Sequence, residues 1–449
     1  MQHDPQNEPP LHDVVGIGFG PSNLALAIAI EEYNESVPRH EALTAAFVER
    51  KPEFGWHRGM LIPGATMQVS FLKDLATLRN PTSRFGFLPY LHDRGRLVDF
   101  TNHKVFFPTR EEFHDYLEWA ATGVDHMVRY GLEVTEIRPV ESRGTVPVLE
   151  VVARAVDGSG EIVLHRARNI VLATGLRPRL PAGIESSARQ WHSGEFLSRL
   201  AELGDTAPER FVVVGAGQSG AEIVDHLHRT HPQAEVHAVI SRYGYSPADD
   251  SPYANRIFDP QAVDVYYAAD EAVKRRLMDY HRNTNYGVVD LDLIDELYRR
   301  SYQEKVRGAE RIRIHGASSL TGVTEHREGV DVRITDTATG RTSDFTADAV
   351  VYATGYDAPD PALLLGDAQA LCLREPSGPL SVARDYRVRT TEELTAGIYL
   401  QGGTEHSHGI TSSLLSLSAV RAGEIRDSLL DRRSGAPTSR PAALSPARA

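Results

Sequence analysis

The sequence DVVGIGFGPSN, residues 13–23, decides the fold class of this chain. A short β-branched run leads into three alternating glycines, Gly16, Gly18 and Gly20, and an apolar stretch, LALAIAIEEY, follows at 24–33. Strand, glycine turn and helix in this order are typical of a dinucleotide-binding βαβ unit. Gly16 allows a tight turn, and Gly18 lets a pyrophosphate approach the backbone. The helix N-terminus then offers unpaired N–H groups to the phosphates.

Two further residues support a nucleotide at this turn. Pro21 stands where a third glycine is usual, and proline suits the first helical position because its missing N–H would be unpaired anyway. The next predicted strand ends in FVER, where the carboxylate of Glu49 could accept hydrogen bonds from an adenosine ribose. A tight β–α turn without any ligand is the alternative that these residues leave open.

A second and complete fingerprint, GAGQSG, occupies residues 215–220 between the strand-like RFVVV and the helical AEIVDHLHRT. The strand after it, EVHAVI, is followed by Arg242 where a site for NAD usually carries an acidic residue. A guanidinium suits the 2′-phosphate, so NADPH is favoured over NADH. The alternative is a solvated arginine that binds no nucleotide.

Two dinucleotide sites in one chain are most simply explained by electron transfer from a nicotinamide to a flavin, with FAD at the N-terminal site. The runs ATGL (173–176) and ATGY (353–356) end predicted strands in small residues that let backbone pass close to a cofactor. Plain strand-end turns would have the same residues. The sequence therefore predicts an α/β fold with two Rossmann-like dinucleotide-binding domains.

The pattern along the chain agrees with an α/β fold. An alternating stretch at 131–168 with a DGSG turn at 157–160 indicates an antiparallel hairpin, and 270–306 is helical with a break at NTNYG (283–287). Buried strands are predicted at 13–18, 44–50, 169–175, 210–217 and 348–355.

Composition excludes several function classes. The chain has 449 residues, more than one core usually holds, and a net charge of −13 that argues against nucleic acid or an anionic membrane as partner. No run reaches the ~18 apolar residues of a membrane span, and the N-terminus does not resemble a signal peptide. The single cysteine, Cys372, favours a reducing, cytoplasmic location. Both ends, 1–11 and 434–449, are expected to be disordered.

No nucleophile-plus-base constellation and no zinc-like cluster is visible in the sequence. His57, His192 and His408 lie in motif-like segments without a recognisable partner, so we expect them to be structural hydrogen-bonding residues. A bound cofactor would then supply the reactive group, and the protein would bind, orient and exclude water.

Several separate blocks together resemble the flavin-dependent N-hydroxylating monooxygenases of siderophore biosynthesis, and the ornithine branch more than the lysine branch. The resemblance extends from about His12 to Glu424. Its blocks are ERKPEFGWHRGM (49–60), MQVSFLKDLATLRNPTSRFGFLPYL (67–91), GRLVDFTN (95–102), GAGQSGAE (215–222), PADDSPYANRIF (247–258), TNYGVV (284–289), ATGYD (353–357) and SHGITSSLLSLSAVR (407–421).

The resemblance implies an FAD domain interrupted by an NADPH domain, with a small substrate-binding region and a homotetrameric assembly. It divides the chain into 12–206 (FAD domain, first part), 207–345 (NADPH domain with a substrate-binding insert) and 346–433 (FAD domain, second part). It also implies the chemistry: NADPH reduces the flavin, O₂ forms a C4a-hydroperoxide, and the neutral side-chain amine of L-ornithine takes up the distal oxygen.

The resemblance assigns roles to individual residues. The expected FAD contacts are Gly16, Gly18, Gly20, Glu49, Trp56, His57, Met67 and Gln68, and the expected NADPH contacts are Gly215, Gly217, Gln218, Ser219 and Arg242. The expected amino-acid contacts are Lys73, Asn255, Asn285 and Ser416, with Gln218 and Lys73 closest to the chemistry. Without the resemblance, Met67 would be predicted to be a core residue, Lys73 a surface lysine and the asparagines turn residues.

Three departures from the family pattern concern single segments. Arg242 is offset by one position, WHSGEF (191–196) lacks the upstream half of a related signature, and GGTEHSH (402–408) lacks an expected asparagine. Alternatives are a lysine or diamine N-monooxygenase, a flavoprotein reductase, and a nucleotide-sensing module without catalysis. A thiol-active reductase is disfavoured because only Cys372 is present.

Overall fold

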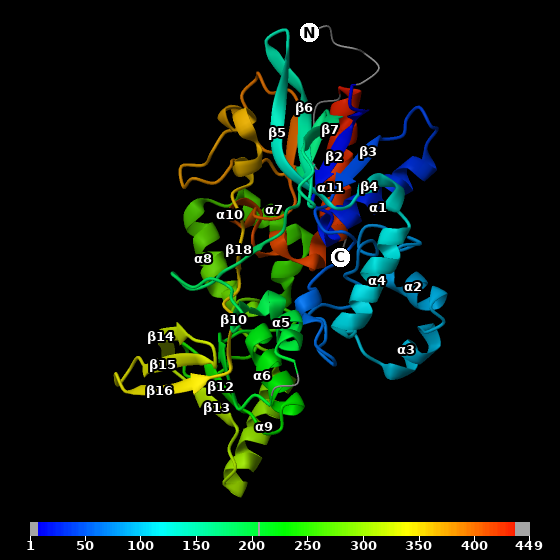
Figure 1. The fold of residues 1–449 in the computed structure, drawn as a ribbon. Coiled ribbons are helices and arrows are strands. Elements are labelled where there is room, and N and C mark those ends of the chain that lie inside the picture. Colours follow the sequence, from blue (N-terminus) through cyan, green and yellow to red (C-terminus); the bar gives the residue numbers. More distant parts are fainter. Residues whose placement is uncertain (1–7, 205–206, 436–449) are drawn as a thin grey trace.

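The computed structural model describes residues 8–204 and 207–435. Two parallel sheets lie in different halves of the molecule, the first in the upper half of Figure 1 and the second in the lower half. The first sheet has the order β19-β8-β2-β3-β4, with all pairings parallel. Its strands are β2 (Val14–Ile17), β3 (Ala45–Val48), β4 (Val128–Arg129), β8 (Asn169–Leu172) and β19 (Gly397–Leu400).

Alternate residues of the first sheet point to opposite faces, one covered by helices and the other by an antiparallel sheet. Val14 and Phe47 pack towards the helices α1 (Pro21–Ser36) and α11 (Ser418–Ser434). Val15 and Ile17 pack towards an antiparallel sheet on the opposite face. Both faces are therefore buried, which explains why these strands are continuous apolar runs in the sequence.

The antiparallel sheet has one more strand pair than the predicted hairpin. The DGSG turn joins β6 (Thr145–Ala155) to β7 (Glu161–Ala167) as expected, but β5 (Leu132–Ser142) also pairs with β6. Arg143 and Gly144, both with positive φ (53° and 80°), form the two-residue turn between them. We did not predict this turn because arginine is uncommon at positive φ.

Part of the expected N-terminal tail is ordered. Strand β1 (Leu11–His12) pairs in parallel with β7, Pro10 accepts a hydrogen bond from Arg166 N, and Glu8 forms an ion pair with Arg166. The prediction of disorder is therefore wrong for residues 8–11, because a free sheet edge is available for pairing. Helix α11 likewise extends to Ser434 with Gly435 as its left-handed cap. The remaining predicted tails, 1–7 and 436–449, lie outside the described residues.

The second sheet has the order β10-β17-β11-β12-β13 and is also parallel throughout. Its strands are β10 (Gln190–His192), β11 (Arg210–Val214), β12 (Glu235–Val239), β13 (Ile312–His315) and β17 (Ala349–Tyr352). Strands β10 and β17 lie outside the expected range 207–345. Domain boundaries at residues 207 and 345 would therefore separate β10 and β17 from the other three strands of their sheet.

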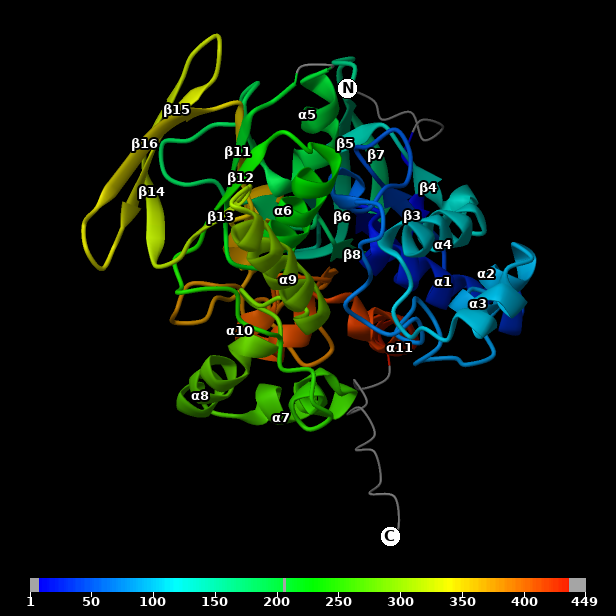
Figure 2. The same cartoon turned by 90° about the horizontal axis from the view of Figure 1, so that it is seen from below.

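Helices and a second antiparallel sheet cover the second parallel sheet. One face carries α5 (Phe196–Glu202), α6 (Gln218–Thr230) and α9 (Leu291–Arg307), and Figure 2 shows α9 lying across α6. The other face packs against β15 (Val330–Asp336), which pairs with β14 (Ser318–Glu325) and β16 (Thr342–Ala347).

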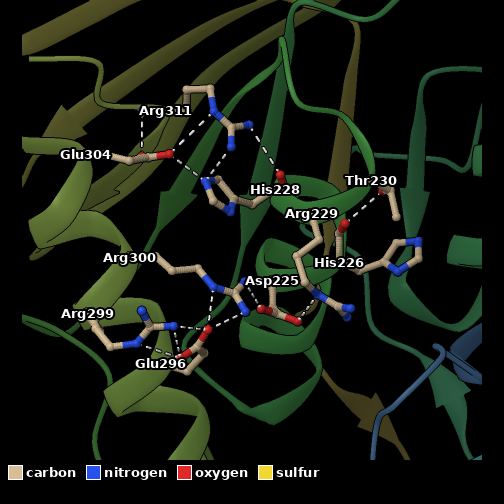
Figure 3. A network of polar contacts seen from close by, with 10 residues as sticks. All are labelled: Asp225, His226, His228, Arg229, Thr230, Glu296, Arg299, Arg300, Glu304 and Arg311. Carbon is tan, nitrogen blue, oxygen red and sulfur yellow. Dashed lines mark hydrogen bonds and ion pairs between the residues drawn. The ribbon is translucent and has the colours of Figure 1, made fainter. Parts of the chain in front are cut away.

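Ion pairs tie α9 to α6 (Figure 3). Asp225 of α6 pairs with Arg300 of α9 at 2.5 Å, and His228 of α6 lies 2.6 Å from Glu304 of α9. Glu304 also pairs with Arg311, which follows the helix. These contacts fix how α9 lies on α6, and therefore where its first residues lie.

A small helical insert lies beside the C-terminal segment. The predicted helical region 270–306 with its break is confirmed as α8 (Glu271–His281), a turn, and α9. The insert also holds η5 (Ala254–Phe258), α7 (Pro260–Ala268) and η6 (Arg282–Thr284), and α7 contacts α10 (Glu405–His408). Figures 1 and 2 both show α7 and α8 next to α10.

The remaining elements complete the first half of the molecule and the crossing between the halves. Strands β9 (Arg177–Pro178) and β18 (Tyr356–Asp357), which follow the two ATG runs, pair antiparallel. No helix among the described residues is long and apolar enough to cross a bilayer. The other helices are η2 (Arg58–Met60), α2 (Phe87–Asp93), α3 (Leu97–His103), α4 (Arg110–Thr122), η3 (Asp125–Met127), η4 (Ser193–Glu195), η7 (Pro361–Leu364), η8 (Gly366–Leu371), η9 (Ile410–Ser413) and η10 (Leu415–Leu417).

Candidate cofactor and substrate site

The two glycine turns are built in the same way. Gly18 has φ +81°, and a Cβ there would lie 2.5 Å from the carbonyl oxygen of Ala173. Gly215 has φ +141°, and a Cβ there would lie 2.3 Å from the carbonyl oxygen of Ala353. Each ATG run therefore presses its alanine carbonyl against one fingerprint, and only glycine fits both the conformation and the space.

The first turn leaves room on its outer side. A Cβ on Gly16 would lie 2.3 Å from the Phe47 ring, whereas a Cβ on Gly20, the N-cap of α1, would meet nothing within 4 Å. Glu49, at the end of β3, is 8% exposed and accepts hydrogen bonds from Phe19 N (2.7 Å) and Lys51 N (3.0 Å). Each carboxylate oxygen keeps further acceptor capacity for a ribose hydroxyl.

A small hollow that is open to solvent lies at the carboxyl ends of β8 and β19. In open α/β sheets this edge is where ligands bind. The hollow lies on the same edge of the first sheet as the glycine turn after β2. Its lining includes Leu172, Thr174, Gly175, Leu400, Gln401 and Gly402.

Trp56, His57 and Met67 lie in the segment between β3 and α2. His57 has a left-handed φ of +49°, and its ring meets Trp56 edge-on at 4.6 Å. Met67 is 5% exposed and belongs to the core around α1 and α4, so its packing role is present whatever else it contacts.

Gln68 and Gln218, from different halves of the molecule, meet at Asp290. The Nε2 of Gln68 donates to Asp290 Oδ2 at 2.6 Å, and the Nε2 of Gln218 donates to the same oxygen at 3.2 Å. Gln218 Oε1 in turn accepts from Asp290 N at 2.9 Å. Burial raises the pKa of Asp290, and Gln68 opposes this by donating to the ionised carboxylate.

A buried ion pair continues this contact between the halves. Gln218 Nε2 also donates to Glu222 at 3.0 Å, and Glu222 accepts a two-pronged contact from Arg110 of α4 at 2.8 and 2.9 Å. We call Arg110, Glu222, Gln218, Asp290 and Gln68 the interdomain hub. We predicted only its two glutamines; Glu222 lies in a block that we noted, and nothing in the sequence marked Arg110 or Asp290.

The second turn brings Arg242 close to the break before α9. Arg242 is exposed, and its Nη1 donates to the carbonyl of Gly287 at 2.7 Å. Gly217 is the N-cap of α6, and a Cβ there would lie 3.6 Å from Gly287 Cα. Ser219 occupies the first turn of α6. The second glycine turn, the N-terminus of α6 and the guanidinium of Arg242 therefore all lie next to the loop at 284–289.

The four expected amino-acid contacts come from three separate segments. The Nζ of Lys73 lies 5.7 Å from the centre of the Phe258 ring, at the end of the turn that carries Asn255. Burial lowers the pKa of Lys73, and Asp259 opposes this shift. Asn255 donates to Asp250 O at 2.6 Å, and Asn285 ends the η6 turn. Ser416 is buried, and its hydroxyl has no hydrogen-bond partner within 8–204 and 207–435.

The segment that departs from the family pattern contacts the substrate loop. Glu405, in GGTEHSH, accepts a hydrogen bond from the hydroxyl of Tyr286, the neighbour of Asn285. Burial raises the pKa of Glu405, and Tyr286 opposes this by donating to the carboxylate. The contact joins the insert to α10.

Two of the three noted histidines are structural, as expected. His192 bonds Gly355 O at 2.8 Å and Gly194 N at 3.0 Å, so both ring nitrogens are occupied. His408 bonds Ser407 Oγ and Arg384 O, and burial lowers its pKa to about 3. The thiol of Cys372 is buried, which raises its pKa to about 11. No group of three potential metal ligands occurs among the described residues.

Comparison with known proteins agrees with this geometry. The sequence profile of the L-lysine 6-monooxygenase/L-ornithine 5-monooxygenase family matches residues 10–358. A relative from Pseudomonas aeruginosa, L-ornithine N(5)-monooxygenase, is 38% identical over 424 residues, covering 93% of this chain and 94% of the relative.

Two solved structures are similar over the same length. The ornithine N-hydroxylase of Kutzneria sp. 744, with reduced FAD, NADP⁺ and L-ornithine, is 49% identical with a TM-score of 0.89, covering 94% of this chain and 100% of that one. L-lysine 6-monooxygenase from Pseudomonas syringae is 35% identical with a TM-score of 0.82, covering 94% and 99%.

The fold and the two glycine turns define a two-nucleotide flavoprotein of the FAD- and NADPH-dependent monooxygenase class, which confirms the predicted fold class and cofactors. Within that class, the chain belongs to the L-lysine 6-monooxygenase/L-ornithine 5-monooxygenase family.

Proposed function

We propose that this chain N-hydroxylates the side-chain amine of L-ornithine. The reaction consumes ornithine, O₂, NADPH and a proton, and gives N5-hydroxyornithine, NADP⁺ and water, which suits siderophore or related biosynthesis. The observation that carries the proposal is the interdomain hub, in which Gln68 from the first glycine-turn domain and Gln218 from the second share one oxygen of Asp290. Such a contact holds two dinucleotide sites facing each other.

The residues of this chain have binding and positioning roles in the proposed reaction. A bound FAD would supply the redox chemistry, with NADPH as the source of electrons and O₂ as the source of the transferred oxygen atom. Gly18 and Gly215 let each turn pack against an alanine carbonyl beside the helix N-terminus that would face a pyrophosphate, and Arg242 offers a guanidinium to the 2′-phosphate. Gln218 lies at the N-terminus of α6, where its amide links the second glycine turn to Glu222 and Asp290.

The substrate would be held at its amino-acid end. Lys73 is a half-buried cation without an ion pair among the described residues, and a carboxylate is its natural partner. Asn255, Asn285 and the unpartnered hydroxyl of Ser416 supply further neutral hydrogen-bonding groups. Because only the δ-amine reacts, an anchor at the α-carbon must set its distance from the flavin.

Ornithine is favoured over lysine by the order of similarity. The Kutzneria ornithine enzyme is 49% identical to this chain, whereas the lysine enzyme from Pseudomonas syringae is 35% identical. The alternative substrates, lysine and diamines, would use the same two cofactors. A cytoplasmic location and a homotetrameric assembly complete the proposal, the former on the single buried thiol of Cys372.

The test is aerobic turnover by the purified protein with L-ornithine. We expect a yellow protein whose NADPH oxidation is stimulated by ornithine and yields N5-hydroxyornithine, detected by mass spectrometry. Reduction of an external acceptor without hydroxylamine formation would instead identify a reductase. A protein that binds no flavin would be left as a nucleotide-binding module.

A further inference from the structure

Arg421, in the first turn of α11, is a buried cation with neutral partners only. Its side chain is 2% exposed. It donates to Ser412 O at 2.6 Å, to Ser22 Oγ at 3.2 Å and to Gln401 Oε1 at 3.4 Å. Among the described residues it forms no direct ion pair, and none of its three hydrogen-bond acceptors is a carboxylate.

The charged groups around Arg421 are already engaged. Glu424, one turn along α11, acts on Arg421 through space, but both its oxygens accept from Arg384 at 2.9 and 3.0 Å. Burial lowers the pKa of Arg421. Taking an unpaired charge out of water is costly unless another charge arrives. The arrangement therefore indicates an anion that the protein chain itself does not supply.

The hydrogen bonds of Arg421 lead directly to the first glycine turn. Ser22 stands in the first turn of α1, and Gln401 Nε2 donates to Ser22 O (3.2 Å) and to Asn23 Oδ1 (3.0 Å). Asn23 Nδ2 in turn donates to Gly18 O at 2.7 Å. The guanidinium thus lies beneath the helix N-terminus that receives a pyrophosphate in this fold.

The same region carries buried polar atoms without partners. The hydroxyls of Thr404 and Ser412 are buried and form no hydrogen bond with any described residue. Both belong to the segment between β19 and α11, and the carbonyl of Ser412 accepts a hydrogen bond from Arg421. Unpartnered buried hydroxyls are uncommon in folded proteins, and they fit a site completed by a bound polar molecule.

We propose that Arg421 is a positioning residue for FAD, whose buried charge is balanced by the pyrophosphate at the N-terminal turn of α1. It acts through Ser22 and Gln401, which it holds against the glycine turn. The dinucleotide brings negative charge to this turn, while the flavin ring is neutral when oxidised. Arg421 should therefore govern how tightly FAD binds and leave the reduction potential of the flavin nearly unchanged.

The test compares Arg421→Gln, Arg421→Lys and a matched control, Arg432→Gln. Arg432 lies on the same helix, and burial lowers its pKa as well, but its neutral partners, Asn169 and Thr395, lie at the opposite end of the sheet. FAD is titrated into each apoprotein, melting temperature is measured with and without FAD, and the midpoint potential is measured on each FAD-loaded protein.

We expect Arg421→Gln to weaken FAD at least tenfold and to reduce the FAD-induced rise in melting temperature. Its apoprotein should melt within a few degrees of the parent, because removing an uncompensated buried charge offsets the lost hydrogen bonds. Arg421→Lys should bind FAD more tightly than Arg421→Gln, and Arg432→Gln should bind it like the parent.

Three outcomes would overturn the proposal. An Arg421→Gln apoprotein that does not fold, or that melts far below the parent, would show a structural role. Equal weakening by Gln and Lys would exclude the charge as the cause. A change of midpoint potential by about 30 mV, a tenfold difference between oxidised and reduced flavin for a two-electron couple, would place the charge at the ring instead.

Discussion

At the scale of single residues, Gly18 and Gly215 show why the fingerprints could be recognised in the sequence. Both have positive φ, and both face an alanine carbonyl at a distance that no Cβ tolerates. Such local backbone requirements can be predicted from the sequence, because only glycine satisfies them. Contacts between side chains that are far apart in the chain cannot be predicted in this way.

Gly18→Val is expected to give a folded protein that lacks FAD. The added side chain would need both an unfavourable φ of +81° and a shift of Ala173 O, now 2.5 Å from the Cβ position. The measurement is the ratio of flavin absorbance to protein after purification. Gly160→Ala, in the DGSG turn, is the control for folding, since its Cβ would meet no described residue within 4 Å and its melting temperature should match the parent. A yellow Gly18→Val protein with stoichiometric FAD would refute the site.

Arg242→Ala is expected to weaken NADPH much more than NADH. Losing a charged hydrogen-bonding partner costs about 1.5–3 kcal/mol, or roughly 10- to 150-fold in affinity. Arg242 has no carboxylate partner among the described residues, so its charge is available to a phosphate. Binding constants for both coenzymes are measured with Arg242→Ala and with Arg242→Lys, which keeps the charge. An unchanged NADPH/NADH ratio in the alanine variant would mean that another group binds the 2′-phosphate.

At the scale of elements, the N-terminus of α9 matters more than its sequence suggests. The period of 270–306 and the break at 283–287 predicted two helices, and the structure contains both. The same pattern could not place Asp290 against Gln68, because these residues are 222 positions apart. The ion pairs of Figure 3 hold α9 on α6, and Asp290 is itself bonded to Gln218, the first residue of α6.

Asp290→Ala is expected to slow hydride transfer from NADPH about tenfold, while FAD content is kept. The variant removes the oxygen shared by Gln68 and Gln218, and a tenfold effect corresponds to ~1.4 kcal/mol, near the value for one hydrogen bond to a charged group. Flavin reduction is followed by anaerobic stopped flow with NADPH, and with dithionite for comparison.

Asp292→Ala is the matched control, because Asp292 lies in the same first turn of α9 and outside the interdomain hub. Both variants remove one acidic residue from the helix N-terminus, so a difference between them isolates the hub. Reduction by dithionite should be unchanged in each. If both variants slowed flavin reduction by NADPH equally, the cause would be the loss of charge at the N-terminus of α9 and not the loss of the interdomain hub.

At the scale of the whole molecule, the two halves are joined where the chain crosses between them twice. The segments after the ATG runs, β9 and β18, pair with each other, and Arg179 donates to Thr354 O at 2.8 Å. The glycine fingerprints and the ATG runs predicted turns at the ends of strands. They could not predict the order of the strands, which depends on pairing between distant segments. For this reason β10 and β17 belong to the second sheet although they lie outside the range expected for it.

The distance between the substrate anchor and the flavin depends on how the parts of the molecule are arranged, and it selects the length of the substrate side chain. Lys73 lies on the segment between β3 and α2, Asn255 and Asn285 lie on the insert, and the flavin turn lies on the first sheet. If the α-carboxylate is fixed at Lys73, the reacting nitrogen must reach about 3–3.5 Å from the activated oxygen. The extra methylene of lysine would carry its amine past that point.

We therefore expect ornithine to give more hydroxylated product per NADPH than lysine, putrescine or cadaverine. One methylene changes binding by only ~1–3 kcal/mol, so lysine should still stimulate NADPH oxidation but release hydrogen peroxide. Diamines lack the carboxylate and leave the half-buried Lys73 unpaired, so they should bind poorly. Lys73→Met should remove this difference by weakening ornithine to the level of putrescine. Tight coupling and a higher kcat/KM with lysine or a diamine would contradict the ornithine assignment but leave N-hydroxylation in place, because the anchor sets chain length and the cofactors set the reaction.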